Sequence, residues 1–259
     1  MKILAVGDVV GSLGTQFIQR NLWKIRKEHG IDMVVLNGEN AAKGNGLDAD
    51  TADVLLASGA DVITSGNHIW KKREIKQYIE DARFVLRPAN YPSACPGTGS
   101  VIFDAMGVKV LVISLIGNVY MHDTVRSPFE TADEILKKNK GEYDICVVDI
   151  HAEATSEKIA LAKYLDGRAS VVFGTHTHVQ TNNACVLPAG TGQVTDVGMT
   201  GVYDSILGVK NENVLDKFLL QMPVWFEEPQ GKIMFNAAVF DIDNSSFLCK
   251  NVSLINFCE

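Results

Sequence analysis

Polar residues that can bind metal ions stand directly after apolar, β-branched runs at several points along this chain of 259 residues. Each apolar run has the length and composition of a buried β-strand. In the first half of the chain, a polar loop and a helical pattern with a period of 3.6 residues follow each run. Because strands that alternate with helices form parallel sheets, their carboxyl ends meet along one edge. The sequence therefore predicts an α/β fold with polar groups gathered at that edge.

The first half of the chain is expected to consist of strand-helix units. Its strands are predicted at residues 3–6, 33–36 and 62–64, and its helices at residues 12–29, 48–58 and around 75–79. Gly30 and Gly59 follow the first two helices, where glycine readily takes the left-handed conformation that ends a helix. Asp48 can cap the start of the second helix.

The second half adds antiparallel strands, so the sheet is expected to be mixed. Strands are predicted at residues 101–103, 109–115, 145–149 and 170–173, the first two as a hairpin, and helices around residues 159–165 and 214–221. Ser127 followed by Pro128 marks another helix start. The tail, residues 224–257, looks like an antiparallel meander. No linker or repeat interrupts the chain, so we expect one layered α/β domain, residues 1–259.

The formal net charge of -7 argues against a protein that holds nucleic acid by neutralising phosphates. A small anionic substrate is compatible with this charge if metal ions supply local positive charge. The cysteines form no C-x-x-C pair, which favours a reducing compartment. No apolar stretch is long enough to cross a membrane or to form a signal-peptide core. We therefore expect a cytoplasmic protein that does not bind a membrane and forms no stable complex with nucleic acid.

The side chains at the predicted strand ends are the donors that a metal site requires. They are Asp8, Glu39, Asn40, Asn67, His151, His176 and His178. Imidazole and carboxylate groups suit iron, manganese or zinc, and amide oxygens can complete an oxygen-rich set of ligands. A single carboxylate such as Glu39 can bridge two ions, and two ions can share a hydroxide that attacks a phosphate.

Taken one at a time, these residues also have simpler interpretations. Asp8 can be a turn or helix-cap residue, and the Glu39-Asn40 pair can belong to an ordinary polar loop. A lone histidine after Asn67 is more often structural or exposed than catalytic. The joint occurrence of donors at successive strand ends is what favours the metal site.

The pair His176 and His178 is the most specific of these signals. Residues two apart in extended backbone point to the same side, as two ligands of one cluster would. Thr175 and Thr177 are then expected to face away from the cluster.

Competing motifs are weak. Gly7, Gly11 and Gly14 have the wrong spacing for the G-x-G-x-x-G fingerprint of dinucleotide binding. The chain contains no P-loop lysine motif, no G-x-S-x-G elbow and no H-E-x-x-H pair. The loop at residues 44–46 is interpreted as flexible, with closure on a substrate as the less favoured alternative.

Several motifs resemble those of the calcineurin-like metallophosphoesterase superfamily, and two resemble its bacterial YmdB-like branch. The superfamily motifs are Gly7-Asp8, Gly66-Asn67-His68, His151 and residues 174–178; the branch motifs are residues 37–42 and 196–201. The chain departs from the broad superfamily in having Val10 in place of a histidine and Glu39 in place of the second aspartate. Both departures are expected of the YmdB-like branch.

The resemblance implies a metallophosphoesterase-type sandwich of two mixed β-sheets flanked by α-helices. It implies two metal ions per chain, iron or manganese or both. One ion would be bound by Asp8, Glu39, Asn40 and His178, and the other by Glu39, Asn67, His151 and His176. His68 would give a proton to the leaving oxygen or stabilise the transition state, and a metal-bridging hydroxide would be the nucleophile. The resemblance also suggests a homo-oligomer.

The leading functional hypothesis is a phosphodiesterase that hydrolyses small phosphate esters such as 2',3'-cyclic nucleotides. A phosphomonoesterase or a nuclease on the same core, and a regulatory protein that senses a nucleotide or metal without hydrolysis, are the alternatives. The segment 118–127 is a candidate for substrate recognition, in which His122 and Arg126 either touch phosphate or are ordinary exposed residues. Substrate choice depends on such loops and does not follow from the sequence.

Overall fold

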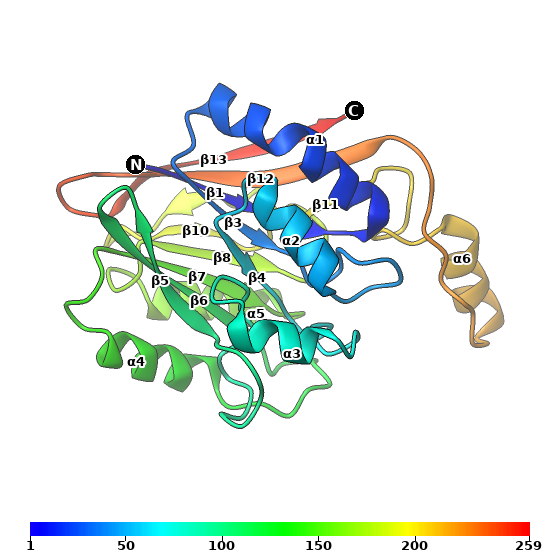
Figure 1. Ribbon diagram of the computed structural model, residues 1–259, viewed down its shortest axis with the longest axis horizontal. Coiled ribbons are helices and arrows are strands. Elements are labelled where there is room, and N and C mark those ends of the chain that lie inside the picture. The colour runs from blue at the N-terminus through cyan, green and yellow to red at the C-terminus, as the bar shows by residue number, and fades with distance from the viewer.

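The computed structural model describes all 259 residues as two β-sheets packed face to face, with helices on both outer sides (Figure 1). The first sheet has the strand order β2-β11-β12-β1-β3-β4, and β13 pairs with β12. Its strands are β1 (Lys2–Val6), β2 (Asp8–Val9), β3 (Met33–Asn37), β4 (Val62–Thr64), β11 (Met199–Val202), β12 (Ile233–Ile242) and β13 (Cys249–Cys258). β1 is parallel to β3 and antiparallel to β12, so this sheet is mixed.

The second sheet has the order β5-β6-β7-β8-β10-β9 and is also mixed. Its strands are β5 (Ser100–Ala105), β6 (Val108–Ile116), β7 (Ile145–His151), β8 (Val171–Thr175), β9 (Cys185–Val186) and β10 (Gly192–Val194). The helices are α1 (Gly11–His29), α2 (Ala49–Ala57), α3 (Ile75–Asp81), α4 (Pro128–Lys138), α5 (Thr155–Tyr164) and α6 (Asn211–Leu220). The predicted sandwich of two mixed sheets flanked by helices is confirmed.

The alternation of side chains along each strand builds the layers. On β1, Ile3 and Ala5 pack between the two sheets, whereas Leu4 and Val6 pack toward α1, and all four are fully buried. The second sheet behaves in the same way, with one face toward the first sheet and the other covered by α4 and α5. Because both faces of the central strands are covered, β1, β3, β7 and β8 read as continuous apolar runs in the sequence, whereas most of β13 is exposed.

The predicted boundaries of the first three helices agree with the structure to within about two residues, whereas α5 and α6 begin at Thr155 and Asn211, before the predicted starts at residues 159 and 214. Gly30 has a left-handed φ of 64° and its N–H bonds to carbonyls of the last turn of α1. The side chain of Asp48 accepts from the N–H of Thr51, and that of Ser127 accepts from the N–H of Glu130. The short strands β2, β9, β10 and β11 were not predicted.

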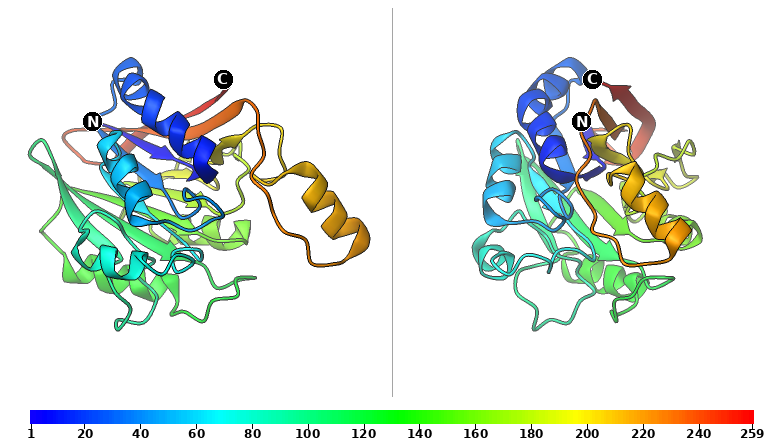
Figure 2. Two further views of the ribbon diagram at one scale, coloured as in Figure 1. Left: turned by 45° about the vertical axis from the view of Figure 1, so that its right-hand side comes forward. Right: turned by 90° about the vertical axis from the view of Figure 1, so that its right-hand side faces the viewer.

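The prediction of a meander over residues 224–257 is wrong in its first part. Residues 224–232 contain no strand, and only β12 and β13 form the expected antiparallel pair. The apolar residues of the first part lie exposed beside α6, Trp225 with 93% of its surface accessible. α6 itself projects from one end of the body (Figures 1 and 2) and buries only Val214. None of the helices combines the length and apolarity that crossing a bilayer requires.

Replacing Phe240 with alanine tests the packing between the sheets. Phe240 is fully buried in the layer between the sheets, so we expect Phe240→Ala to lower the free energy of unfolding by about 3–5 kcal/mol in a urea titration. Phe218→Ala is the matched control, because Phe218 is 72% exposed on α6 and its loss should change stability by less than about 0.5 kcal/mol. Equal effects of the two changes would contradict the layered core.

The single domain stays a prediction that the same urea titration tests, since two separate unfolding transitions would contradict it.

Candidate metal centre and active site

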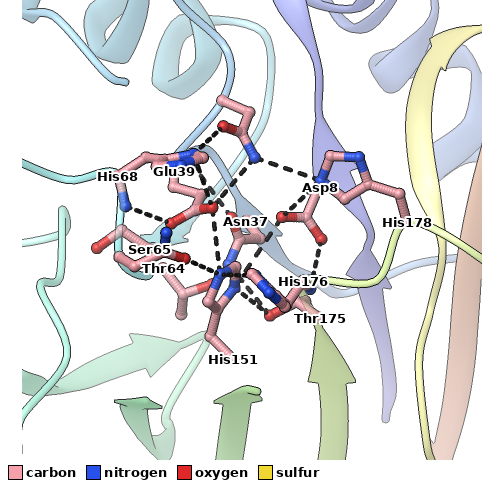
Figure 3. Close-up of polar contacts among 12 residues, drawn as sticks. Asp8, Asn37, Glu39, Thr64, Ser65, His68, His151, Thr175, His176 and His178 are labelled. Atoms are coloured by element: carbon pink, nitrogen blue, oxygen red, sulfur yellow. Dashed lines mark hydrogen bonds and ion pairs between the residues drawn. The ribbon is translucent and has the colours of Figure 1, made fainter. Parts of the chain in front are cut away.

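The predicted donor residues converge where the carboxyl ends of strands from both sheets meet (Figure 3). The first sheet supplies residues at or just after β1, β3 and β4, and the second sheet supplies residues at the ends of β7 and β8. These residues are Asp8, Glu39, Asn40, Asn67 and His68 from the first sheet, and His151, His176 and His178 from the second. The cluster therefore lies in the seam between the sheets, not at the edge of a single sheet.

Two carboxylates, Asp8 and Glu39, are buried at 0% and 1% exposure. Their ion-pair partners are all histidines, with His151 Nε2 at 3.1 Å from Glu39 Oε1 and His178 Nε2 at 3.5 Å from Asp8 Oδ1. Asp8 Oδ1 is buried and accepts no hydrogen bond. An unsatisfied buried carboxylate oxygen is costly in a protein interior unless a cation lies beside it. The site therefore fits a bound metal ion.

The histidines and carboxylates shift one another's pKa values. Burial opposes the charged form of Asp8 and Glu39, but His178 beside Asp8 and His151 beside Glu39 outweigh it and lower both carboxyl pKa values. Burial likewise opposes the imidazolium of His151, but Glu39 and Asp8 raise its pKa to about 9. Burial, with a contribution from His151, lowers the pKa of His176 to about 4. Without a metal ion, His176 is therefore neutral at pH 7 whereas His151 is protonated, so a metal ion that binds His151 must displace its proton.

One group of donors surrounds His151 Nε2. Glu39 Oε1 and Asn67 Oδ1 each lie 3.1 Å from this nitrogen, and His176 Nδ1 lies 3.0 Å away. Ligand atoms of Glu39, His151 and His176 all lie within 4.8 Å of one another, a separation that one metal ion can span. Imidazole, carboxylate and amide oxygen form a donor set suited to a first-row transition metal.

A second group of donors gathers around Asp8. It contains Asp8, His178 and Asn40, whose Nδ2 is 3.1 Å from Glu39 Oε1 and 3.3 Å from His178 Nε2. The Oδ1 of Asn40 instead accepts from His68 Nδ1 at 2.7 Å. Coordination of a cation by Asn40 Oδ1 would require the amide to turn over.

Glu39 contacts members of both groups through Oε1. Asp8 also reaches the first group, because its Oδ2 accepts from the backbone N–H of His176 at 3.1 Å and its Oδ1 lies 4.0 Å from His151 Nδ1.

His68 lies at the opening of the site. The backbone N–H of His68 donates to Glu39 Oε2 at 3.0 Å, and its ring nitrogen Nδ1 donates to Asn40 Oδ1. The other ring nitrogen, Nε2, is therefore the one that can reach a substrate. The side chain is 25% exposed and lines an open cleft. Burial lowers the pKa of His68 despite the opposing charge of Glu39.

The backbone predicted for His176 and His178 is wrong, although both imidazoles reach the cluster. β8 ends at Thr175, and the two histidines have positive φ angles of 97° and 61°, so the segment turns and is not extended. Thr177 holds the turn by donating its hydroxyl to Asp196 Oδ2 at 2.7 Å. Nor does Thr175 face away, because its hydroxyl contacts His151 Nδ1 at 2.9 Å.

Sequence reasoning also missed a buried polar group behind the donors. Asp149, on β7, is fully buried and accepts hydrogen bonds from Asn37, Thr64 and Thr175. Burial raises its pKa to about 6, against the effect of the Thr64 and Thr175 hydrogen bonds. The signal that could have found it is a carboxylate two residues before His151 inside an otherwise apolar strand, since a buried charge needs partners.

An open cleft of about 400 Å³ leads to the donors. Beside His68, His176 and His178, its wall contains Asn45 from the 44–46 loop and Phe226 from the segment that follows α6. No residue of the segment 118–127 lines it, and Arg126 pairs with Glu134 at 3.0 Å between Nη1 and Oε2. His122 and Arg126 are exposed and lie outside the lining of this cleft, and a role for them in substrate recognition stays a prediction.

Comparison with known proteins places this geometry in a family. The YmdB-like protein family matches residues 4–255. The chain belongs to the YmdB-like family. A Bacillus subtilis (strain 168) member, named 2',3'-cyclic-nucleotide 2'-phosphodiesterase, is 44% identical over 246 residues, which cover 95% of this chain and 93% of that protein.

Two solved structures of similar size share the whole fold. A hypothetical protein from Thermus thermophilus has a TM-score of 0.93 at 40% identity, with full coverage of both chains. A Mycoplasma pneumoniae protein, described as a novel phosphatase, also has a TM-score of 0.93, at 30% identity, covering 100% of this chain and 93% of that chain. The predictions of the family, of a metallophosphoesterase-type fold and of a phosphoesterase are confirmed at this level.

Replacing Gly66 with alanine tests the proximity of the segment after β4 to the donors. A Cβ at Gly66 would lie 2.1 Å from His151 Cδ2 and 2.3 Å from its Nε2, so the imidazole must move. We expect Gly66→Ala to lose bound Mn²⁺ when metal per chain is measured after loading, with a stability cost of about 1–3 kcal/mol from overpacking. Gly141→Ala is the control, since Gly141 has a φ of 85° and nothing within 4 Å of its Cβ. Gly141→Ala should cost about 1–2 kcal/mol of stability and leave metal binding intact. Full metal binding by Gly66→Ala would contradict the role of His151 as a donor.

Proposed function

We propose that this YmdB-like protein is a metal-dependent phosphodiesterase that binds two ions and hydrolyses 2',3'-cyclic nucleotides. The observation that carries the proposal is the pair of donor groups that the buried carboxylate of Glu39 contacts. Asp8 Oδ1, buried and without a hydrogen bond, supports a cation in the group around it. The name of the Bacillus subtilis relative supports the choice of substrate.

The two donor groups divide the ligands as the family resemblance implies. Asp8, Asn40 and His178 would hold one ion, Asn67, His151 and His176 the other, and Glu39 would contact both. When bound, two such ions supply positive charge for a phosphate and activate water at neutral pH. Iron and manganese match the mixture of imidazole, carboxylate and amide donors. The negative charges of Asp8 and Glu39 would partly neutralise the positive charge of two bound metal ions.

The remaining residues bind and orient the substrate. His68 would give a proton from Nε2 to the leaving ribose oxygen, because this nitrogen has no partner in the protein and the ring lies at the mouth of the cleft. The phosphate anion of the substrate favours the protonated imidazole, which offsets the effect of burial on the pKa of His68. The open cleft accommodates the nucleoside part of a small ester. A homo-oligomer remains part of the proposal, and the exposed apolar residues around α6 are consistent with it.

Two alternatives use the same donors. A phosphomonoesterase or nuclease differs in the substrate that enters the cleft, and a sensor binds ligand without hydrolysis. The net charge of -7 disfavours a long nucleic acid substrate. The presence of His68 beside a complete set of donors favours turnover over sensing.

Removal of the Glu39 charge tests the paired metal site. Glu39→Gln keeps the size of the side chain but removes the negative charge that both donor groups contact. We therefore expect fewer than two ions per chain and a loss of hydrolysis greater than about 100-fold. The loss should be this large because mutation of even an indirect partner of a metal ligand costs about 10–100-fold. Metal per chain and hydrolysis of bis-p-nitrophenyl phosphate are measured on identical preparations. Treatment of the wild type with a chelator should have the same effect, and Mn²⁺ should restore activity.

Glu157→Gln is the matched control for this experiment. Glu157 is also buried, at 7% exposure, but it accepts from the N–H groups of Asn118 and Val119 and lies outside the donor groups. It should keep two ions and full activity. A fully active, metal-loaded Glu39→Gln protein would refute the shared-carboxylate site, and a metal-loaded wild type that hydrolyses no ester would favour the sensor.

The role of His68 predicts a dependence on the leaving group. His68→Ala should lower hydrolysis of 2',3'-cyclic AMP by about 10²–10⁴-fold, because the ribose oxygen needs a proton as it leaves. p-Nitrophenolate leaves without protonation, so hydrolysis of bis-p-nitrophenyl phosphate should fall by less than about 10-fold, below the usual range for a general acid. Equal losses on both substrates, with two ions still bound, would mean that His68 acts in another way.

A further inference from the structure

Asp149 joins the two sheets directly behind the donor cluster. Its Oδ2 accepts from Asn37 Nδ2 at 3.1 Å and from the Thr64 hydroxyl, which belong to β3 and β4 of the first sheet. Its Oδ1 accepts from the Thr175 hydroxyl at 2.8 Å, on the neighbouring strand of its own sheet. All of these side chains are fully buried. Asp149 contacts no atom proposed to bind a metal ion, so its effect on the site must pass through a neighbour.

That neighbour is Thr175, whose hydroxyl lies between Asp149 and His151. A hydroxyl has one proton to donate, and Thr175 gives it to the carboxylate of Asp149. Toward His151 Nδ1, which is 2.9 Å away, the same oxygen can then only accept. Asn37 Nδ2 is another donor near this nitrogen, but at 3.5 Å it is too far away to compete with the Thr175 oxygen. Nδ1 of His151 therefore carries the hydrogen. In a neutral imidazole this leaves Nε2 with its lone pair free.

The free lone pair points where a cation would be held. Glu39 Oε1, Asn67 Oδ1 and His176 Nδ1 lie 3.0–3.1 Å from His151 Nε2. His151 itself is fully buried, and its backbone register fixes it opposite Thr175 on β8. The wrong tautomer would place a hydrogen among these donors and repel a metal ion.

We propose that Asp149, acting through the Thr175 hydroxyl, is a positioning residue that holds His151 as the Nδ1–H tautomer and presents its Nε2 to a divalent cation. The inference rests on the proposed metal site and adds residues that the set of donors does not contain. Asn37 and Thr64 hold the Asp149 carboxylate in place from the opposite sheet.

The first test reads the tautomer directly. Metal-free protein labelled with ¹⁵N-histidine is studied above pH 9, where the His151 imidazole is neutral, and a long-range ¹H–¹⁵N spectrum distinguishes its two ring nitrogens. We expect the hydrogen on Nδ1 in the wild type. A hydrogen on Nε2 would overturn the proposal, whatever the behaviour of any variant.

The second test measures the dissociation constant for Mn²⁺. Thr175→Val removes the hydroxyl while keeping the shape of the side chain, so we expect affinity to fall by about 10–100-fold, the usual effect of losing a partner of a metal-binding histidine. Thr175→Ser retains the hydroxyl and should bind nearly as well as the wild type. Thr131→Val is the control for loss of a buried hydroxyl, since Thr131 is 3% exposed and its hydroxyl has no hydrogen-bond partner.

The outcomes separate this inference from the proposed function. Unchanged Mn²⁺ affinity in folded Thr175→Val, with a wild type that binds Mn²⁺, would overturn the positioning role alone. A wild type that binds no Mn²⁺ would overturn the metal site and the positioning role together. If Thr175→Val does not fold, the wild-type tautomer decides.

Discussion

The arrangement of this YmdB-like protein depends on two carboxylates, Asp8 and Glu39, that are buried without any lysine or arginine beside them. Burying a charge is unfavourable unless an opposite charge or several hydrogen-bond donors accompany it. Here the accompanying groups are histidines, which come mainly from the opposite sheet. The two sheets must therefore meet at their carboxyl ends for the carboxylates to be tolerated, and the packing of the sandwich and the composition of the site are parts of one constraint.

The central features of the fold could be predicted because they depend on local patterns. Continuous apolar runs, a glycine after α1 and Asp48 before α2 each carry their own signal, and the structure agrees with them. The strand-end rule also led to the donor residues, since each is close in sequence to the strand that carries it. Strands of two or three residues, such as β2 and β9, contain too few side chains to show a period.

What the sequence could not predict depends on contacts between distant segments. In the sequence, Asp149 is one polar residue at the end of an apolar run. The hydrogen bonds that it accepts from Asn37 and Thr64 of the other sheet appear only in the folded structure. The alternating sequence around His176 resembles extended backbone, but Asp196, far along the chain, bonds to Thr177 and turns it. In both cases the decisive partner belongs to a different strand or loop.

The left-handed backbone at His176 and His178 has a consequence for how such a sequence can change. A residue with a side chain costs of order 1–3 kcal/mol in an unfavourable backbone region, and glycine would relieve that cost at either position. At His178, however, glycine would also leave the buried carboxylate of Asp8 without its imidazole partner, and breaking a buried charge pair costs about 3–5 kcal/mol. The strained backbone is therefore retained together with the carboxylate, and neither can be exchanged alone without a loss of folding stability.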